Sequence, residues 1–166
     1  MSTFVSVGNA TQPFDRLING VISNMHLLPA PIYIQHGNSY FNNKNLDTNT
    51  ITATKFLNMN QFESKIRECE ILILHAGAGS SIHAIKSGKI PIIMPRLSKY
   101  GEHVDDHQLE LALELDARKL AVILKDFNYL SEAILNLKTI FNLKKINSKS
   151  VLFEEIDNLL YKYLNA

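Results

Sequence analysis

The chain has 166 residues, of which 46% are hydrophobic and 20% are charged, and its formal net charge is +1. This length and composition fit one globular domain that buries roughly 70% of its unfolded surface. The 17 basic and 16 acidic residues leave no surplus of positive charge for a nucleic-acid backbone. The chain also has no cluster of basic residues that would bind an anionic membrane surface. We therefore expect neither nucleic-acid binding nor direct membrane insertion.

The single cysteine, Cys69, excludes an internal disulfide and a cysteine metal cage, which favours a reducing compartment. The first residues lack the charged and apolar regions of a signal peptide. No later apolar run approaches the ~20 residues that span a bilayer. The sequence therefore predicts a cytoplasmic protein.

Short apolar runs alternate with segments of helical spacing along the whole chain. Strands are predicted at residues 3–7, 31–35, 71–74, 91–94 and 121–124, with a weaker candidate at 50–56. Helices are predicted at residues 14–25, 60–69, 80–87, 105–115 and 129–137, and residues 37–49 are predicted to form a loop. This order predicts an α/β fold with a doubly wound, mostly parallel, Rossmann-like sheet.

The apolar residues after position 147 recur at helical spacing. We expect residues 1–166 to form a single domain in which residues 148–166 are a C-terminal helix. That helix would dock on this domain or on a partner.

In such a sheet, ligands bind in the loops that follow the carboxyl ends of the strands. The loop of residues 8–16 begins with Gly8 and has Pro13 at a position that suits a first helical turn. Its backbone could approach a phosphate. A plain turn, in which Thr11 caps the helix and Arg16 is solvated, is the alternative that the residues alone favour.

The loop of residues 75–81 is the best candidate for an anion site, because its glycines leave backbone N–H groups open at a helix N-terminus. It lacks the Gly-Lys-Ser/Thr ending of a Walker loop. It also fails the dinucleotide fingerprint, because Ile82 stands where the third glycine belongs. A tight glycine turn that lets the helix pack near the sheet is an equally good interpretation.

The loop of residues 95–110 crowds charged and histidine side chains into one connection. Alternatively, Asp105 caps the next helix in a capping box with Gln108, and the remaining charges are solvated. A zinc-protease pattern would need a glutamate directly after His103, where Val104 stands, so the sequence does not favour metal catalysis. No nucleophile elbow surrounds Ser80, and His36 is interpreted as an ordinary loop histidine.

These three loops carry a resemblance to a known family. The runs Val5-Ser-Val-Gly8, Gln12-Pro-Phe-Asp-Arg-Leu17, His75-Ala-Gly-Ala-Gly-Ser80 and Lys99-Tyr-Gly-Glu-His-Val-Asp-Asp-His-Gln108, together with Pro95-Arg96, occur in this order. They resemble the bacterial PssE and eukaryotic Alg13 group, the donor-binding halves of split family-28 glycosyltransferases. The resemblance covers most of residues 3–125.

The resemblance implies the C-terminal, nucleotide-sugar-binding half of a GT-B enzyme. A separate membrane-associated subunit, similar to PssD or Alg14, would bind the acceptor and recruit this chain to the inner face of the membrane. No cofactor and no metal are implied beyond the UDP-sugar substrate. The donor-binding residues implied by motif position are Gly8, Asn9, Gln12, His75, Ala76, Gly77, Ala78, Gly79, Ser80, His83, Arg96, Tyr100, Glu102, His103, Asp106, His107 and Gln108.

Two positions depart from the family pattern. Asn9 and Ala10 follow Gly8, where relatives commonly carry Thr and then a polar residue. His83 stands where related transferases usually have an acidic residue that accepts the ribose hydroxyls. Because a neutral histidine offers one acceptor nitrogen, ribose recognition would be weaker or rearranged.

The leading hypothesis is inverting sugar transfer from a UDP-sugar to a lipid-linked or polysaccharide-precursor acceptor. The main general base is expected on the partner, with His107 as a local candidate. A non-catalytic accessory subunit that stabilises or activates a partner transferase is the alternative. A stand-alone nucleotide-binding α/β protein is a more distant one.

Overall fold

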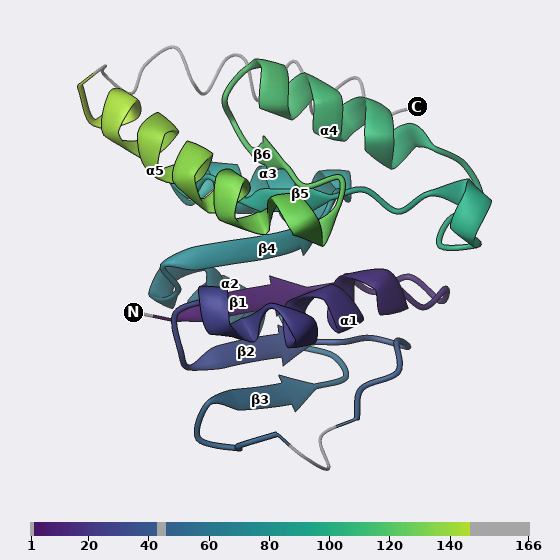
Figure 1. Ribbon diagram of the computed structural model, residues 1–166. Helices are drawn as coiled ribbons and strands as arrows, with labels where there is room; N and C mark the ends of the chain where they lie inside the picture. The colour runs from purple at the N-terminus through teal and green to yellow at the C-terminus, as the bar shows by residue number, and fades with distance from the viewer. Residues whose placement is uncertain (1, 43–45, 147–166) are drawn as a thin grey trace.

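The computed structural model describes residues 2–42 and 46–146 (Figure 1). In chain order these residues form β1 (Thr3–Ser6), α1 (Asp15–Ser23), a 3-10 turn (Met25–Leu27), β2 (Ile32–Gln35), β3 (Ile51–Thr54), α2 (Met59–Glu68), β4 (Ile71–His75), α3 (Ala78–Lys86), β5 (Ile92–Met94), a 3-10 turn (Ser98–Tyr100), α4 (His107–Ala117), β6 (Val122–Ile123), a 3-10 turn (Phe127–Tyr129) and α5 (Leu130–Ile146). None of the described helices is both long enough and apolar enough to cross a bilayer.

The strands form one six-stranded sheet in the order β3-β2-β1-β4-β5-β6, and every neighbouring pair is parallel. The chain moves outward from β1 to β3, then returns to β4 on the other side of β1 and moves outward to β6 (Figure 1). The order therefore reverses between β1 and β4. The loops that leave these two strands separate at this point and leave room for a ligand.

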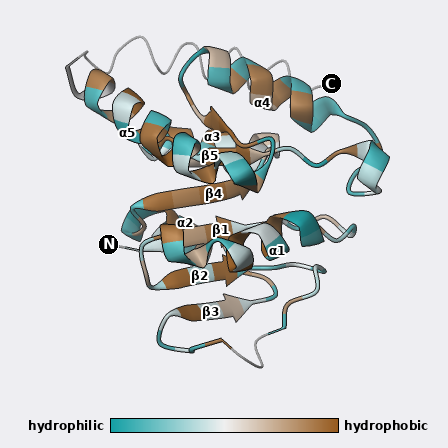
Figure 2. Ribbon diagram, in the orientation of Figure 1, coloured by the Kyte–Doolittle hydropathy of each residue, from teal (hydrophilic) through white to brown (hydrophobic). Residues whose placement is uncertain are grey.

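The core has two layers, because consecutive residues of a strand point to opposite faces of the sheet. Val5 lies in a cluster with residues of α1 and α5, whereas Phe4 lies in a cluster with residues of α2, α3 and α4. Figure 1 shows α1 and α5 in front of the sheet and α2 and α3 behind it. The brown strands of Figure 2 are apolar almost throughout, as both faces of a covered parallel sheet require.

The predicted α/β class and the doubly wound parallel sheet are confirmed, and the weak strand candidate at residues 50–56 contains β3. Several boundaries were wrong. The helix predicted at residues 80–87 begins at Ala78, the helix predicted at 14–25 ends at Ser23, and the helix predicted at 129–137 continues to Ile146. The C-terminal helix predicted at residues 148–166 lies outside the described residues.

A buried arginine holds the loops at the carboxyl edge of the sheet together. Arg96 follows β5 and is 0% exposed. Its guanidinium donates hydrogen bonds to the carbonyl oxygens of Val7, Gln12, Pro13 and Glu102 at 2.8–3.3 Å. Burial lowers the pKa of Arg96 to about 10, which still leaves it charged at neutral pH. One side chain thus ties the loop after β1 to the loop after β5.

A second arginine reinforces this connection. Arg16 of α1 donates from Nε and one terminal nitrogen to the two carboxylate oxygens of Glu102, at 2.9 and 2.7 Å, and also donates to the Pro95 carbonyl. The interpretation of Arg16 as solvated is therefore wrong. Thr11 does not cap α1 either, because its hydroxyl donates to the Gln12 side chain and the helix begins at Asp15.

Substitution of Arg96 by methionine should lower the free energy of unfolding by about 3 kcal/mol, because buried carbonyl groups lose their donor and Glu102 loses a nearby positive charge. Equilibrium urea denaturation of R96M measures the loss. R118M is the control, since the exposed Arg118 pairs with a half-buried Glu114 within one helix, and its expected effect is below about 0.5 kcal/mol. Equal stability of the two variants would contradict this role of Arg96.

Candidate functional site

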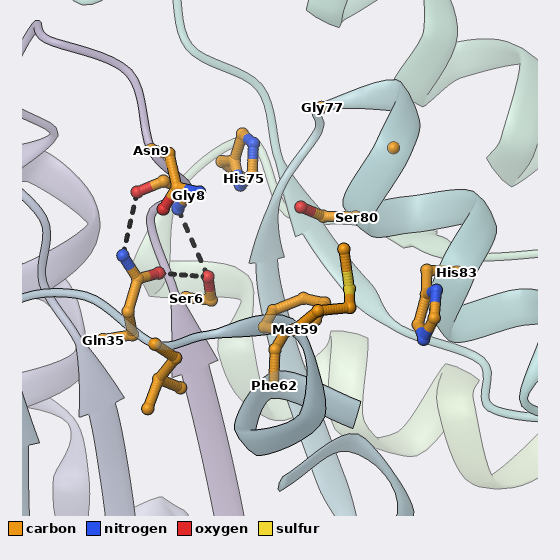
Figure 3. Close-up of a pocket in the computed structure, with 12 residues that line it drawn as sticks. Ser6, Gly8, Asn9, Gln35, Met59, Phe62, His75, Gly77, Ser80 and His83 are labelled. Atoms are coloured by element: carbon orange, nitrogen blue, oxygen red, sulfur yellow. Dashed lines mark hydrogen bonds between the residues drawn. The ribbon is translucent and has the colours of Figure 1, made fainter. Parts of the chain in front are cut away.

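A pocket of about 390 Å³ opens at the carboxyl ends of β1 and β4, where the strand order reverses (Figure 3). It is lined by Ser6, Gly8, Asn9, Gln35, Leu57, Met59, Phe62, His75, Gly77, Gly79, Ser80 and His83. The pocket thus brings together the first and second loops that the sequence analysis singled out. One of its ends is polar and glycine-rich, and the other is largely apolar.

The loop after β1 is held by a buried network of polar side chains. Ser6 donates to Gln35 Oε1 at 2.5 Å and accepts a hydrogen bond from the Gly8 N–H at 3.2 Å (Figure 3). The Gln35 amide donates to the carbonyl oxygens of Gly8 and Lys55 at 2.9 and 3.1 Å. Gly8 has a φ of +76°, a backbone conformation that favours glycine. This network fixes the course of the loop over the pocket.

The sequence analysis missed Ser6 and Gln35 as site residues. Both are buried, and each stands at the end of a strand that is otherwise largely apolar. A buried polar side chain needs a hydrogen-bond partner, so a polar residue at the end of an apolar strand was the available signal.

His75 occupies the space between the two glycine loops. A Cβ atom on Gly8 would lie 2.4 Å from Cε1 of His75, and one on Gly77 would lie 2.3 Å from its Nε2. Only glycine therefore fits at either position without moving the imidazole. Figure 3 shows the ring between Gly8 and Gly77.

The His75 side chain is neutral at physiological pH. Its pKa is lowered to about 4, first by burial and then by the positive charge of Arg96, with His103 as a smaller cause. Within the described residues its Nδ1 is buried and has no hydrogen-bond partner. The site therefore contains a neutral imidazole that packs the two loops against each other.

The N-terminus of α3 provides the anion-binding element of the pocket. Gly77 is the residue before the helix, and no side chain caps the first turn. The early N–H groups of α3 are thus available to a ligand, and the helix dipole adds partial positive charge there. Ser80 contributes a hydroxyl at the same end of the pocket. This arrangement suits a phosphate or diphosphate group.

The opposite end of the pocket is formed by the segment that enters α2. Leu57, Met59 and Phe62 line it together with His83 of α3, whose ring centroid lies 6.1 Å from that of Phe62. From the sequence, a helix was predicted at residues 60–69, and this segment was given no part in the site. Flat and apolar side chains of this kind suit the planar base of a nucleotide.

The third loop contributes no described residue to the pocket lining. Seven residues of this loop were predicted as donor ligands: Arg96, Tyr100, Glu102, His103, Asp106, His107 and Gln108. Gln12 of the first loop was also predicted, and it does not line the pocket either. Arg96 and Glu102 are buried, and the Arg96 guanidinium donates to the Glu102 carbonyl oxygen. The side-chain oxygen of Gln108 accepts from the Arg96 N–H at 3.2 Å, and Gln12 is bound through its carbonyl.

The alternative of a capping box formed by Asp105 and Gln108 is wrong, although the Asp105 carboxylate accepts from the His107 N–H at 3.1 Å. Helix α4 begins at His107, so the residue before it is Asp106, whose carboxylate accepts from the Ser98 N–H. That hydrogen bond lowers the pKa of Asp106. The expectation that the remaining charges of this loop are solvated is also wrong for Glu102, which is 5% exposed.

Two histidines flank the Asp105 carboxylate on the outer side of the loop. Nδ1 of His103 lies 3.0 Å from one oxygen, and Nε2 of His107 lies 3.8 Å from the other. His107 is 72% exposed, and its Nδ1 lies 3.5 Å from Glu110. In residues 2–42 and 46–146, no group of three His, Cys, Asp or Glu side chains is arranged to hold a metal ion.

The remaining predicted residues lie along the second loop. Ala76 is buried and its N–H donates to the Met94 carbonyl, which joins this loop to β5. Ala78 and Gly79 begin α3, and a Cβ atom on Gly79 would meet no other atom within 4 Å. Asn9 lines the pocket beside Gly8 (Figure 3).

Comparisons with known proteins assign this architecture to a family. Residues 2–156 match the model of the glycosyltransferase family 28 C-terminal domain. The UDP-N-acetylglucosamine transferase subunit ALG13 of Yarrowia lipolytica is 25% identical over 134 residues, which are 76% of this chain and 66% of that protein. The protein of the same name from Mus musculus is 29% identical over 118 residues, 68% of this chain and 10% of that protein.

The fold is also similar to a solved structure. The crystal structure of Acinetobacter baumannii MurG matches with a TM-score of 0.55 and 17% sequence identity. The match covers 96% of this chain and 49% of that chain, so this chain has the fold of about half of MurG. The family match extends over the whole described sheet and both glycine loops. The chain belongs to the glycosyltransferase family 28 C-terminal domain family.

Proposed function

We propose that this chain is the donor-binding subunit of an inverting glycosyltransferase that uses a UDP-sugar. The observation that carries the proposal is the pocket between β1 and β4, where an uncapped helix N-terminus faces an apolar wall. A nucleoside diphosphate has matching parts, a diphosphate for the polar end and a base for the apolar end. Membership of the family 28 C-terminal domains supports this use of the pocket.

The relatives favour a uridine nucleotide. Both curated relatives are named as subunits of a UDP-N-acetylglucosamine transferase, which makes UDP-N-acetylglucosamine the first donor to test. The chain spans 66% of the fungal relative and 10% of the mouse relative, so the remaining parts of those proteins have no counterpart in this comparison.

The residues of the pocket stabilise negative charge on the leaving group. As the bond between the sugar and the diphosphate breaks, charge accumulates on the departing UDP. Fixed N–H groups at the start of α3 stabilise that charge with little reorganisation, because the Ser6–Gln35 network and His75 hold the loops in place.

We place the acceptor on a separate, membrane-associated subunit similar to Alg14 or PssD, which would recruit this chain to the inner face of the membrane. The acceptor would be a lipid-linked glycan or polysaccharide precursor. Its hydroxyl needs a general base, and the exposed His107 beside Asp105 is the candidate on this chain, with the partner as the main source.

A non-catalytic accessory subunit is the second candidate function. It is favoured because the side chains of Arg96 and Glu102 form hydrogen bonds within the protein. Neither is therefore free to contact a donor sugar. Donor binding by the isolated chain separates the two candidates. So does the activity of the reconstituted pair after disruption of the glycine loop, because an accessory subunit does not need that loop for transfer.

Gly77→Ala should weaken UDP binding at least tenfold, because the new Cβ atom would lie 2.3 Å from His75 Nε2 and would displace the ring or the loop. Ser87→Ala is the control, since Ser87 lies at the C-terminal end of the same helix and outside the pocket lining, so UDP binding should stay unchanged. Isothermal titration with UDP measures both variants. An equal loss of binding in both variants, or no loss in either, would contradict the role given to the His75 contact.

His75 should make the protein less stable in mild acid. The unfolded chain takes up a proton at this histidine near pH 6.5, whereas the folded chain does so only near pH 4. The free energy of unfolding should therefore fall between pH 6.5 and pH 4, by up to about 3 kcal/mol more than in His75→Asn. Urea denaturation across this range measures it. His26→Asn, at an exposed site, should keep the wild-type slope, and a His75→Asn slope equal to wild type would refute the expectation.

Gln108→Ala should lower sugar transfer by the reconstituted pair at least tenfold and leave UDP binding by the isolated chain nearly unchanged. Gln108 lies outside the pocket lining and bonds to the Arg96 backbone, so its loss affects the third loop rather than the diphosphate site. Steady-state transfer and UDP titration are measured on the same preparation. An unchanged transfer rate would remove Gln108 from the site.

A further inference from the structure

A second hollow, of about 480 Å³, lies at the opposite edge of the sheet from the pocket between β1 and β4. It is formed by the amino end of β4, the segment that enters β5 and the C-terminal half of α5, which lie on the same side of the molecule in Figure 1. Most of its wall is apolar, with side chains from Ile71, Leu72, Ile90, Leu137 and Phe141. Phe141 is 56% exposed. An apolar hollow beside an exposed aromatic ring is typical of a surface that another segment covers.

Helix α5 brings the chain to this hollow. Asn142 lines the hollow, and the helix ends four residues later, at Ile146, which is about 6 Å along its axis. Residues 147–166 follow and lie outside the described residues. Their first four residues are enough for a connection between two helices that reverses the chain direction. A helix over residues 151–164 would be about 21 Å long. The end of the chain can therefore reach the hollow.

The sequence of this C-terminal segment has an apolar stripe that suits the wall of the hollow. Seven apolar residues recur at spacings of three and four and would share one face of a helix: Leu152, Phe153, Ile156, Leu159, Leu160, Tyr163 and Leu164. The residues between them are mostly polar. Such a helix is stable only when its apolar face is buried against another surface.

The charges of the segment and of the hollow are complementary. Three acidic residues stand within residues 154–157 of the segment, against two lysines at positions 149 and 162. The hollow is lined by two lysines, Lys89 and Lys138, and by one acidic residue, Glu70. The acidic part of the segment would therefore lie beside a hollow with an excess of positive charge, which favours this occupant over a basic one.

We propose that residues 151–164 dock in this hollow of their own chain, with the apolar stripe against Phe141 and Leu137, and so close the amino edge of the sheet. A second copy of this chain and a partner subunit are the other occupants that the test separates. Because the hollow and the nucleotide pocket lie at opposite edges of the sheet, this docking leaves the pocket open.

The test uses the full chain with one fluorescent reporter. The chain has no tryptophan, so Phe153→Trp introduces a single indole into the segment. Its emission should be that of a shielded indole, with slow quenching by acrylamide. Both properties should be unchanged between about 1 and 100 µM protein, because docking within one chain does not depend on concentration. Light scattering on the same samples gives the number of chains in the particle.

Two pairs of variants in this background locate the contact. Phe141→Glu should raise the quenching constant about threefold, because it places a charge against the apolar stripe. Leu135→Glu is its matched control, since Leu135 is also an exposed apolar residue of α5, at 64%, but does not line the hollow. Ile156→Asp should have the same effect as Phe141→Glu. Asn158→Asp, outside the apolar stripe, should have none.

The outcomes distinguish the possible occupants. A shielded indole in a single chain, exposed by Phe141→Glu and not by Leu135→Glu, supports the proposal. It is overturned if Phe141→Glu leaves the shielding intact, because the segment then packs elsewhere. Shielding that is lost on dilution or occurs only in a dimer assigns the segment to a second copy, and an indole exposed in the isolated chain but shielded by the acceptor-binding subunit assigns it to the partner. Either result would also overturn the proposal.

Discussion

The separation of the two glycine loops depends on a single imidazole ring. His75 ends β4 and fills the space between Gly8 and Gly77, at distances that leave no room for a Cβ atom on either glycine. A larger residue at either glycine position would collide with the ring. The pocket that leads from the first turn of α3 to the apolar wall therefore depends on this packing. Because burial and Arg96 keep the ring neutral, it fills the space without bringing a charge into the core.

Buried polar side chains near this contact also hold the loops in place. Gln35 holds the Gly8 carbonyl, and Arg96 holds carbonyl groups of the loop after β1 and of its own loop. Arg16 neutralises Glu102 on the outer side of Arg96. These side chains fix the course of the loops around the pocket, and preorganised groups stabilise charge more effectively than mobile ones. Arg96 and Glu102 thus position the backbone of the loops.

The sequence predicted the parts of the structure that depend on local patterns. Apolar strands separated by helices indicated the parallel sheet, and glycines after β1 and β4 indicated the two loops of the pocket. Contacts between distant residues escaped prediction, because nothing local specifies a partner. Arg16 and Glu102 are 86 positions apart, and Ser6 and Gln35 are 29 apart. The apolar wall was missed for a similar reason, since Phe62 has the spacing of a core residue and only the fold places it at the pocket.

The central claim is that this chain by itself holds the nucleotide of a sugar donor between β1 and β4. The most direct measurement is a titration of the ¹⁵N-labelled chain with UDP, followed by the amide resonances of each residue, with ADP as a control. We expect saturable shifts that are largest at Gly8, at residues 77–80 and around Phe62 and His83, and weaker effects of ADP. Saturable shifts centred elsewhere, such as in the hollow beside Lys89 and Phe141 at the other edge of the sheet, or no saturable shifts at all, would contradict it.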